Sequence, residues 1–99
     1  MTNEQRANTI IEQMGGFGRL GAMTGANNFI FDDKGITFKF KGSRKVNCVK
    51  VELTGNDDYT MRFYKVGRVN FKEVEVIEGV YNDMLINIFE STTGLYLSL

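Results

Sequence analysis

The chain has 99 residues, 42% hydrophobic and 24% charged, and its 12 basic and 12 acidic side chains give a formal net charge of zero. This length suits one globular domain, so we expect a single domain over residues 1–99. With one cysteine and no histidine, the sequence excludes an internal disulfide bond, a Cys/His zinc site and a histidine-based catalytic triad. No apolar run reaches the ~20 residues that span a bilayer, and the polar N-terminus lacks a signal-peptide core. We therefore expect a cytoplasmic protein without a membrane partner.

The first predicted element is a helix over residues 2–14. Thr2 and Gln5 have the spacing of a capping box, and Gly15 suits the left-handed position that ends many helices. Four apolar side chains recur at helical spacing on one face: Ala7, Ile10, Ile11 and Met14. The glycine-rich, apolar segment that follows predicts a turn and a short buried strand around residues 19–24.

From residue 28 apolar residues recur at every second position, which is typical of β-strands. The pattern predicts a hairpin with its turn at residues 32–35 and further strands on either side of a turn at residues 54–58. We expect these side chains to point inward: Phe29, Phe31, Ile36, Phe38, Phe40, Val49, Val51, Leu53, Tyr59, Met61, Phe63, Val74 and Val76.

A second helix is predicted over residues 81–93, with an apolar stripe of Leu85, Ile88, Phe89 and Thr92. Gly94 and Leu95 fit a Schellman ending, and we expect the apolar tail, residues 96–99, to dock against the sheet. The order of elements predicts an α+β fold. It is a four- to five-stranded antiparallel meander with the N-terminal and C-terminal helices packed on one face. The other face of the sheet is left open to solvent.

A G-x-G-x-x-G match falls at Gly16, Gly18 and Gly21. In a dinucleotide-binding protein these glycines stand between a strand and a helix, whereas here they follow a predicted helix. We favour a structural role, with Gly15 as a helix cap and the glycines from Gly16 to Gly25 permitting tight turns or close backbone approach.

Charge is unevenly distributed along the chain. Residues 34–50 hold six cations and no acid, whereas the chain from Glu73 onward holds acids and no base. Strand alternation projects four cations from the open face beside Tyr64: Lys39, Lys41, Lys50 and Arg62. Cations beside an aromatic ring suit single-stranded nucleic acid, in which phosphates contact Lys or Arg and bases stack. The lysines also fit a solvated, aggregation-resistant face, and the segregated charges fit contacts between protein partners.

No catalytic centre is predicted. The pairs Asp32-Asp33 and Asp57-Asp58 could bind a divalent cation, but they lack a recognisable ligand set, and turn formation explains them more simply. Cys48 has no histidine to activate it and is expected to be an inert, half-buried thiol. We therefore expect no enzymatic activity, no metal and no cofactor.

The segments Met23-Thr24-Gly25-Ala26-Asn27-Asn28-Phe29 and Thr93-Gly94-Leu95-Tyr96 resemble a group of short, uncharacterised bacteriophage and prophage proteins. Members of that group share an M-T-G-A-x-N-F segment and a T-G-L-Y C-terminus. The likeness extends from about Met14 to Leu99 and implies a setting inside a bacterial host cell. It implies no reaction and no functional residues.

The sequence thus predicts a non-enzymatic accessory module that binds a macromolecule through a lysine-rich sheet face. Nucleic acid is the leading partner, with Lys39, Lys41, Lys50 and Arg62 on phosphates and Tyr64 stacking on a base. The alternative is a protein-binding module that modulates a host or phage complex, or a small homo-oligomeric structural protein.

Overall fold

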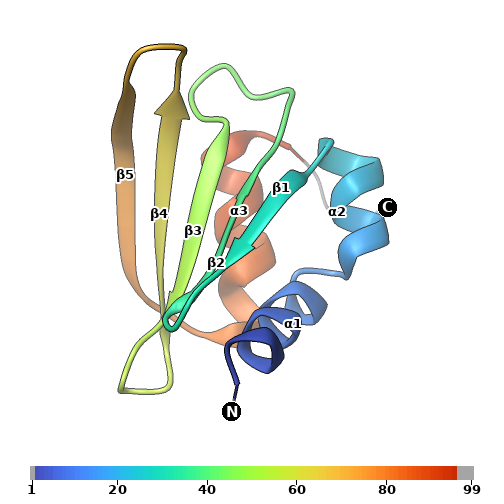
Figure 1. Ribbon diagram of the computed structural model, residues 1–99, viewed down its shortest axis with the longest axis vertical. Helices are drawn as coiled ribbons and strands as arrows, with labels where there is room; N and C mark the ends of the chain where they lie inside the picture. Colours follow the sequence, from blue (N-terminus) through green and yellow to red (C-terminus); the bar gives the residue numbers. More distant parts are fainter. Residues whose placement is uncertain (1, 96–99) are drawn as a thin grey trace.

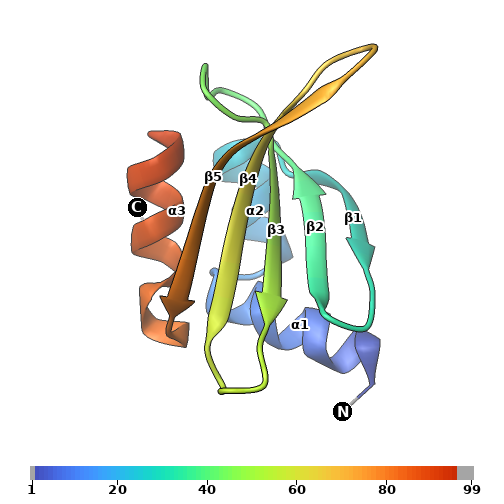
Figure 2. The ribbon, with the colours of Figure 1, turned by 90° about the vertical axis from the view of Figure 1, so that its left-hand side faces the viewer.

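The computed structural model describes residues 2–95. The elements, in chain order, are α1 (Asn3–Gln13), α2 (Phe17–Thr24), β1 (Asn27–Phe31), β2 (Gly35–Lys39), β3 (Cys48–Leu53), β4 (Tyr59–Val66), β5 (Phe71–Val80), a 3₁₀ turn η1 (Asn82–Met84) and α3 (Leu85–Thr93). The five strands form one sheet in the order β1-β2-β3-β4-β5, and every neighbouring pair is antiparallel. All three α-helices lie on one face of this sheet (Figures 1 and 2). The predicted α+β meander is confirmed.

Helix α1 begins and ends at the caps that the sequence predicts. The Gln5 backbone N–H donates to Thr2 Oγ1 at 3.1 Å, and the Thr2 N–H donates to Gln5 Oε1 at 3.0 Å, which completes the capping box. At the other end the Gly16 N–H bonds to the Ile11 carbonyl at 2.8 Å, and Gly15 has a φ of 106°. This is a Schellman ending, and it turns the chain directly into α2.

The predicted buried strand around residues 19–24 is wrong, because the segment forms the two-turn helix α2. Gly16 and Gly25, both at positive φ, bracket this helix at its N-cap and C-cap. Gly18 and Gly21 lie inside it, and a Cβ added to either would meet no atom within 4 Å. These two glycines therefore serve neither a turn nor a close approach, whereas Gly16 and Gly25 do permit turns.

The core lies between the sheet and the helices. The inner faces of β2, β3 and β4 alternate as predicted, and the four predicted inward side chains of α1 are at most 1% exposed. Phe89 of α3 is fully buried. Its ring centroid lies within 6.4 Å of the ring centroids of three other phenylalanines: Phe38, Phe40 and Phe63. Burying such a side chain contributes about 1.5–3 kcal/mol, so this ring cluster attaches α3 to the sheet. In β1, Phe29 packs against the core, but Phe31 is 48% exposed, contrary to prediction.

Strand β5 presents a different face from the predicted one. Val74 and Val76, expected inward, are 44% and 37% exposed, whereas Val80 is fully buried and Ile77 packs against the core. The register with β4 shifts twice, between Tyr59 and Met61 and between Phe63 and Tyr64. Each β-bulge inserts a residue and so reverses which side chains face the core.

Helix α3 begins at Leu85 and not at residue 81, because η1 precedes it. The Gly94 N–H bonds to the Glu90 carbonyl at 2.9 Å, and the Leu95 N–H bonds to Thr93 Oγ1 at 3.1 Å. This is the simpler left-handed cap and not the predicted Schellman ending, which would bond the Leu95 N–H to a helix carbonyl. The predicted docking of the tail, residues 96–99, lies outside the described residues.

Candidate nucleic-acid interface

Four of the five predicted site residues share the open face of the sheet, the face turned toward the viewer in Figure 2. Cys48 of β3 pairs with Lys39 of β2 on one side and with Tyr64 of β4 on the other. Lys39 and Tyr64 therefore belong to one row of side chains that crosses the sheet. In the next row, Lys50 of β3 lies opposite Arg62 of β4. The predicted strand alternation is therefore correct for these four side chains.

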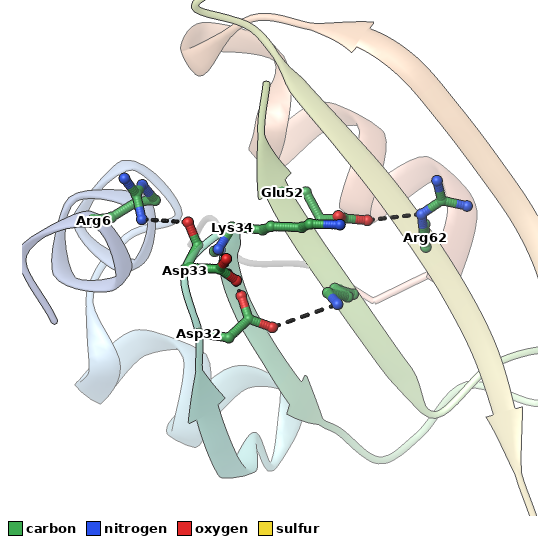
Figure 3. Close-up of polar contacts among 8 residues, drawn as sticks. Arg6, Asp32, Asp33, Lys34, Glu52 and Arg62 are labelled. Carbon is green, nitrogen blue, oxygen red and sulfur yellow. Dashed lines mark hydrogen bonds and ion pairs between the residues drawn. The ribbon is translucent and has the colours of Figure 1, made fainter. Parts of the chain in front are cut away.

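Carboxylates neutralise the second of these rows. Lys50 Nζ lies 3.5 Å from Asp32 Oδ2, and Arg62 Nε donates to Glu52 Oε1 at 2.7 Å (Figure 3). Arg62 Nη1 also lies 3.6 Å from Glu73 Oε2. These ion pairs raise the pKa of Arg62, chiefly through the hydrogen bond that its Nε donates to Glu52. These two cations face three carboxylates, so the middle of the open face has no excess of positive charge and a phosphate there would compete with the carboxylates.

Lys41, which was predicted on the open face, belongs to neither of these cross-strand rows. Strand β2 ends at Lys39, and the Lys41 N–H donates to the Thr24 carbonyl of α2 at 2.8 Å. The aliphatic part of its side chain passes Gly25, where an added Cβ would lie 3.4 Å from Lys41 Cβ. Lys41 is therefore held at the end of the sheet, next to the C-terminal end of α2.

Tyr64 has an aromatic neighbour that the sequence did not indicate. Its ring centroid is 5.9 Å from that of Phe71, with an edge-to-face angle of 69°. Phe71 is 68% exposed, so one of its faces is accessible. Burial raises the pKa of Tyr64, and the Glu73 carboxylate raises it further, so the ring is neutral at physiological pH. The pair offers an apolar platform at the β4–β5 edge of the open face.

Two loops at one end of the sheet carry six cations that have no carboxylate partner among the described residues. The β2–β3 loop, residues 40–47, and the β4–β5 hairpin, residues 65–72, emerge at the same end (Figures 1 and 2). We call this region the basic end and define it by six exposed side chains that form no ion pair with any described residue: Lys41, Arg44, Lys45, Lys65, Arg68 and Lys72. Neither loop contains an aspartate or glutamate.

Within the basic end, Lys65 lies directly opposite Lys72 across the β4–β5 pair. Like charges in this position destabilise a sheet. A polyanion that supplies negative charge between them would remove the penalty.

Asn47 connects the two loops. Its side-chain Nδ2 donates to the Val66 carbonyl at 2.9 Å, and its Oδ1 accepts from the Val66 N–H at 2.7 Å. Its backbone N–H donates to the Tyr64 carbonyl at 2.9 Å, and its carbonyl accepts from the Phe40 N–H at 3.0 Å. The side chain thereby extends the β3–β4 ladder and fixes the spacing between the loops.

The opposite end of the sheet is rich in aspartates. The turns after β1 and β3 carry Asp32, Asp33, Asp57 and Asp58, with Lys34 as their one cation. Asp32 Oδ1 accepts from the N–H groups of Lys34 at 2.8 Å and Gly35 at 3.0 Å, and Asp58 accepts from the Thr54 hydroxyl. The predicted turn-forming role is confirmed for the carboxylates of Asp32 and Asp58. No group of three or more potential metal-ligating side chains occurs within residues 2–95.

Two other predicted features have structural roles. Cys48 is 6% exposed, more deeply buried than expected, and this burial raises the pKa of its thiol while Lys39 lowers it. The G-x-G-x-x-G segment forms the N-cap and the interior of α2 and is preceded by α1, so it lacks the preceding strand that a dinucleotide fingerprint requires.

Sequence reasoning missed the basic end as a unit. Lys65, Arg68, Phe71 and Lys72 were not among the predicted site residues, and Arg44 and Lys45 appeared only in a basic run. The signal available was the absence of acids from residues 40–47 and from residues 62–72. What joins the two segments is the meander, which brings alternate connections to one end.

Comparison of the chain with protein-family models, curated proteins and solved structures gives no match. Among the described helices, none combines the length and hydropathy needed to cross a lipid bilayer.

Proposed function

We propose that this protein is a non-enzymatic module that binds single-stranded nucleic acid at its basic end, with bases stacked on Phe71 and Tyr64. The observation that carries the proposal is the Lys65–Lys72 pair. Two lysines face each other without a carboxylate in either loop, an arrangement that costs stability unless an anion is bound. In the phage-type setting that the sequence resemblance suggests, such a module would act as an accessory factor.

Single strands fit this surface better than a duplex does. Exposed aromatic rings bind unpaired bases at about 1–3 kcal/mol per base, whereas a duplex hides its base faces. The Tyr64–Phe71 pair borders the hairpin that carries Lys65, Arg68 and Lys72. Because side chains in a strand alternate between faces, Lys65 and Lys72 point to the other face of the hairpin from Tyr64 and Phe71. A bound strand therefore crosses the edge of the hairpin to place phosphates on these lysines and bases on the rings. Lys39, in the same cross-strand row as Tyr64, extends this track along the open face.

The zero net charge does not argue against this surface, because the four aspartates of the turns are separated in space from the basic end, although Glu73 lies opposite Tyr64. The aspartate-rich turns lie at the far end of the sheet. Beyond the Debye length of about 8 Å at physiological salt, their repulsion is largely screened.

The test is a fluorescence-anisotropy titration of a labelled oligonucleotide of about 12 nucleotides, within the range of known single-strand sites. Six phosphate contacts predict a slope of log affinity against log salt of about −4. The double variant Lys65→Gln, Lys72→Gln is expected to bind more weakly, with a slope about 1.4 units shallower. Removing the like-charge pair should leave folding intact or improve it, so weaker binding would not reflect unfolding.

Lys34→Gln is the matched control, since it removes one lysine from the opposite end of the sheet. It should leave both affinity and slope unchanged. Absence of binding at about 50 mM salt, where phosphate contacts are strong, would rule out the proposal. Equal slopes for the wild type and the double variant would remove Lys65 and Lys72 from the site.

A second candidate function is association with protein through β5. This ten-residue strand is at the edge of the sheet, and Phe71, Val74 and Val76 are exposed along it. Long exposed edge strands with apolar side chains are templates for strand pairing. Sedimentation equilibrium of the purified protein tests homo-oligomerisation. A dimer that Val76→Lys dissociates would favour this function, and a monomer across the concentration range would exclude self-association.

A further inference from the structure

A cavity of about 370 Å³ lies between the β2–β3 loop and the C-terminal end of α3. One wall is formed by Ser43, Arg44 and Lys45 of the loop, and the facing wall by Ser91 and Thr92 of the helix. Its volume is at the lower end of the range for small-molecule sites, about 300–1,000 Å³. The cavity is separate from the Tyr64–Phe71 pair.

Backbone geometry fixes both walls. Gly42 has a φ of 98°, and a Cβ there would lie 3.0 Å from Leu95 Cδ2, so the loop packs tightly against the chain that leaves α3. Gly94, with a φ of 77°, ends the helix through its bond to the Glu90 carbonyl. Each wall thus contains a glycine in a backbone conformation that other residues rarely adopt.

One polar group in the loop wall lacks a partner. Ser43 Oγ is buried and has no hydrogen-bond partner in the described part of the chain. Buried hydroxyls are nearly always hydrogen-bonded, and an exception calls for an explanation. Ser43 lines the cavity, so the candidate partner of its hydroxyl is a ligand bound there.

The two walls have opposite electrostatic character. Arg44 and Lys45 are exposed and form no ion pair with a described residue. The helix wall is the C-terminal end of α3, which carries partial negative charge and carbonyl groups without helical partners. A simple anion is attracted by the loop but repelled by the helix. A suitable ligand places an anionic group toward Arg44 and Lys45 and hydroxyl donors toward Ser91 and Thr92.

We infer that this cavity binds the phosphate–sugar unit of a nucleotide. The phosphate accepts hydrogen bonds from Arg44, Lys45 and the Ser43 hydroxyl, and the sugar hydroxyls donate to the last carbonyls of α3. The nucleotide is either free or the terminal residue of a bound strand. The second possibility, the terminal residue of a bound strand, rests on the proposed function, whereas binding of a free nucleotide does not.

The test uses adenosine 5′-monophosphate as the probe and follows backbone amide resonances by NMR. Titration should shift the signals of Ser43, Thr92 and Gly94. Adenosine, which lacks the phosphate, and inorganic phosphate, which lacks the sugar, should each bind at least tenfold more weakly. No shift at these residues, or equal binding of adenosine, would overturn the inference. Equal binding of inorganic phosphate would overturn the role assigned to the helix wall.

Ser43→Ala removes the unpartnered hydroxyl without removing charge, and Arg44→Gln removes one cation of the loop wall. Each should weaken nucleotide binding about tenfold, as expected for loss of a charge-assisted hydrogen bond. Lys34→Gln is the matched control, since it removes a cation from the turn at the opposite end of the sheet, and it should bind the nucleotide normally. Unchanged affinity in both Ser43→Ala and Arg44→Gln would overturn the site.

Oligonucleotides with a 5′-phosphate and with a 5′-hydroxyl separate the two sources. If the strand end occupies the cavity, Ser43→Ala should weaken binding of the phosphorylated oligonucleotide alone. Nucleotide binding without oligonucleotide binding would support the inference and contradict the proposed function. Oligonucleotide binding without nucleotide binding would support the proposed function and contradict the inference that the cavity binds a nucleotide.

Discussion

The carboxylate of Asp32 shows how one side chain stabilises the turn between β1 and β2. Its Oδ1 accepts two backbone N–H groups, and its Oδ2 faces Lys50 at 3.5 Å. The Lys34 N–H makes the largest contribution to lowering the pKa of this carboxyl below its ordinary value of 3.8, and Lys50 lowers it further. The ionised form is therefore favoured in the folded state.

A group whose pKa is lowered by folding stabilises the protein above its unfolded pKa and ceases to do so as pH falls through its folded pKa. Asp32→Asn keeps an acceptor oxygen but has no charge to titrate. We expect the variant to be less stable than the wild type at neutral pH, with the difference shrinking once pH falls below 3.8. Urea denaturation across this pH range measures it. A difference that stays constant with pH would show that the charge has no role.

Glycines within the regular elements differ in what they permit. Gly35, at the start of β2, has ordinary φ, but an added Cβ would lie 1.9 Å from the Val51 carbonyl oxygen of β3. Since that oxygen belongs to the backbone of a central strand, the strands would have to separate. Gly21, inside α2, has open space around it.

Gly35→Ala is expected to destabilise the protein by about 1–3 kcal/mol or more, as overpacking does. Gly21→Ala should stabilise it by about 0.5–1 kcal/mol, because alanine loses less backbone entropy in a helix. Chemical denaturation of both variants gives the two values. A tolerated Gly35→Ala would contradict the close approach of β2 and β3, and a destabilising Gly21→Ala would contradict the helical assignment of α2.

At the scale of elements, prediction succeeded where a pattern was strong and regular. The cap of α1 and the inward faces of β2, β3 and β4 follow directly from local sequence. Helix α2 was missed because its glycines have low helix propensity, and its helical form depends on packing of Leu20, which is fully buried. The inward side chains of β5 were assigned wrongly because β-bulges depend on the partner strand and leave no clear mark in a single sequence.

Across the whole molecule, Asn47 couples the β2–β3 loop to the β4–β5 hairpin. Asn47→Ala removes both side-chain bonds to Val66 and should cost about 1–3 kcal/mol of stability. Because the cations remain, we expect weaker oligonucleotide binding with the same salt dependence. Anisotropy titrations at several salt concentrations measure both quantities. A shallower slope would show instead that phosphate contacts had been lost.

The candidate site could be predicted only in part. Strand alternation placed Lys39, Lys50, Arg62 and Tyr64 on one face, because side-chain direction in a strand has a period of two. The ion pairs that neutralise Lys50 and Arg62 join strands and turns distant in sequence, and the basic end joins two separate loops. Such relations depend on tertiary contacts, and no local pattern encodes them.

The central claim is that the basic end, and not the middle of the open face, binds nucleic acid. The most direct test is to map oligonucleotide binding by backbone amide NMR. We expect shifts in residues 41–45 and 64–72, with none in the turns at residues 32–34 and 54–58. Shifts centred on Lys50 and Arg62, or confined to the aspartate-rich turns, would contradict it.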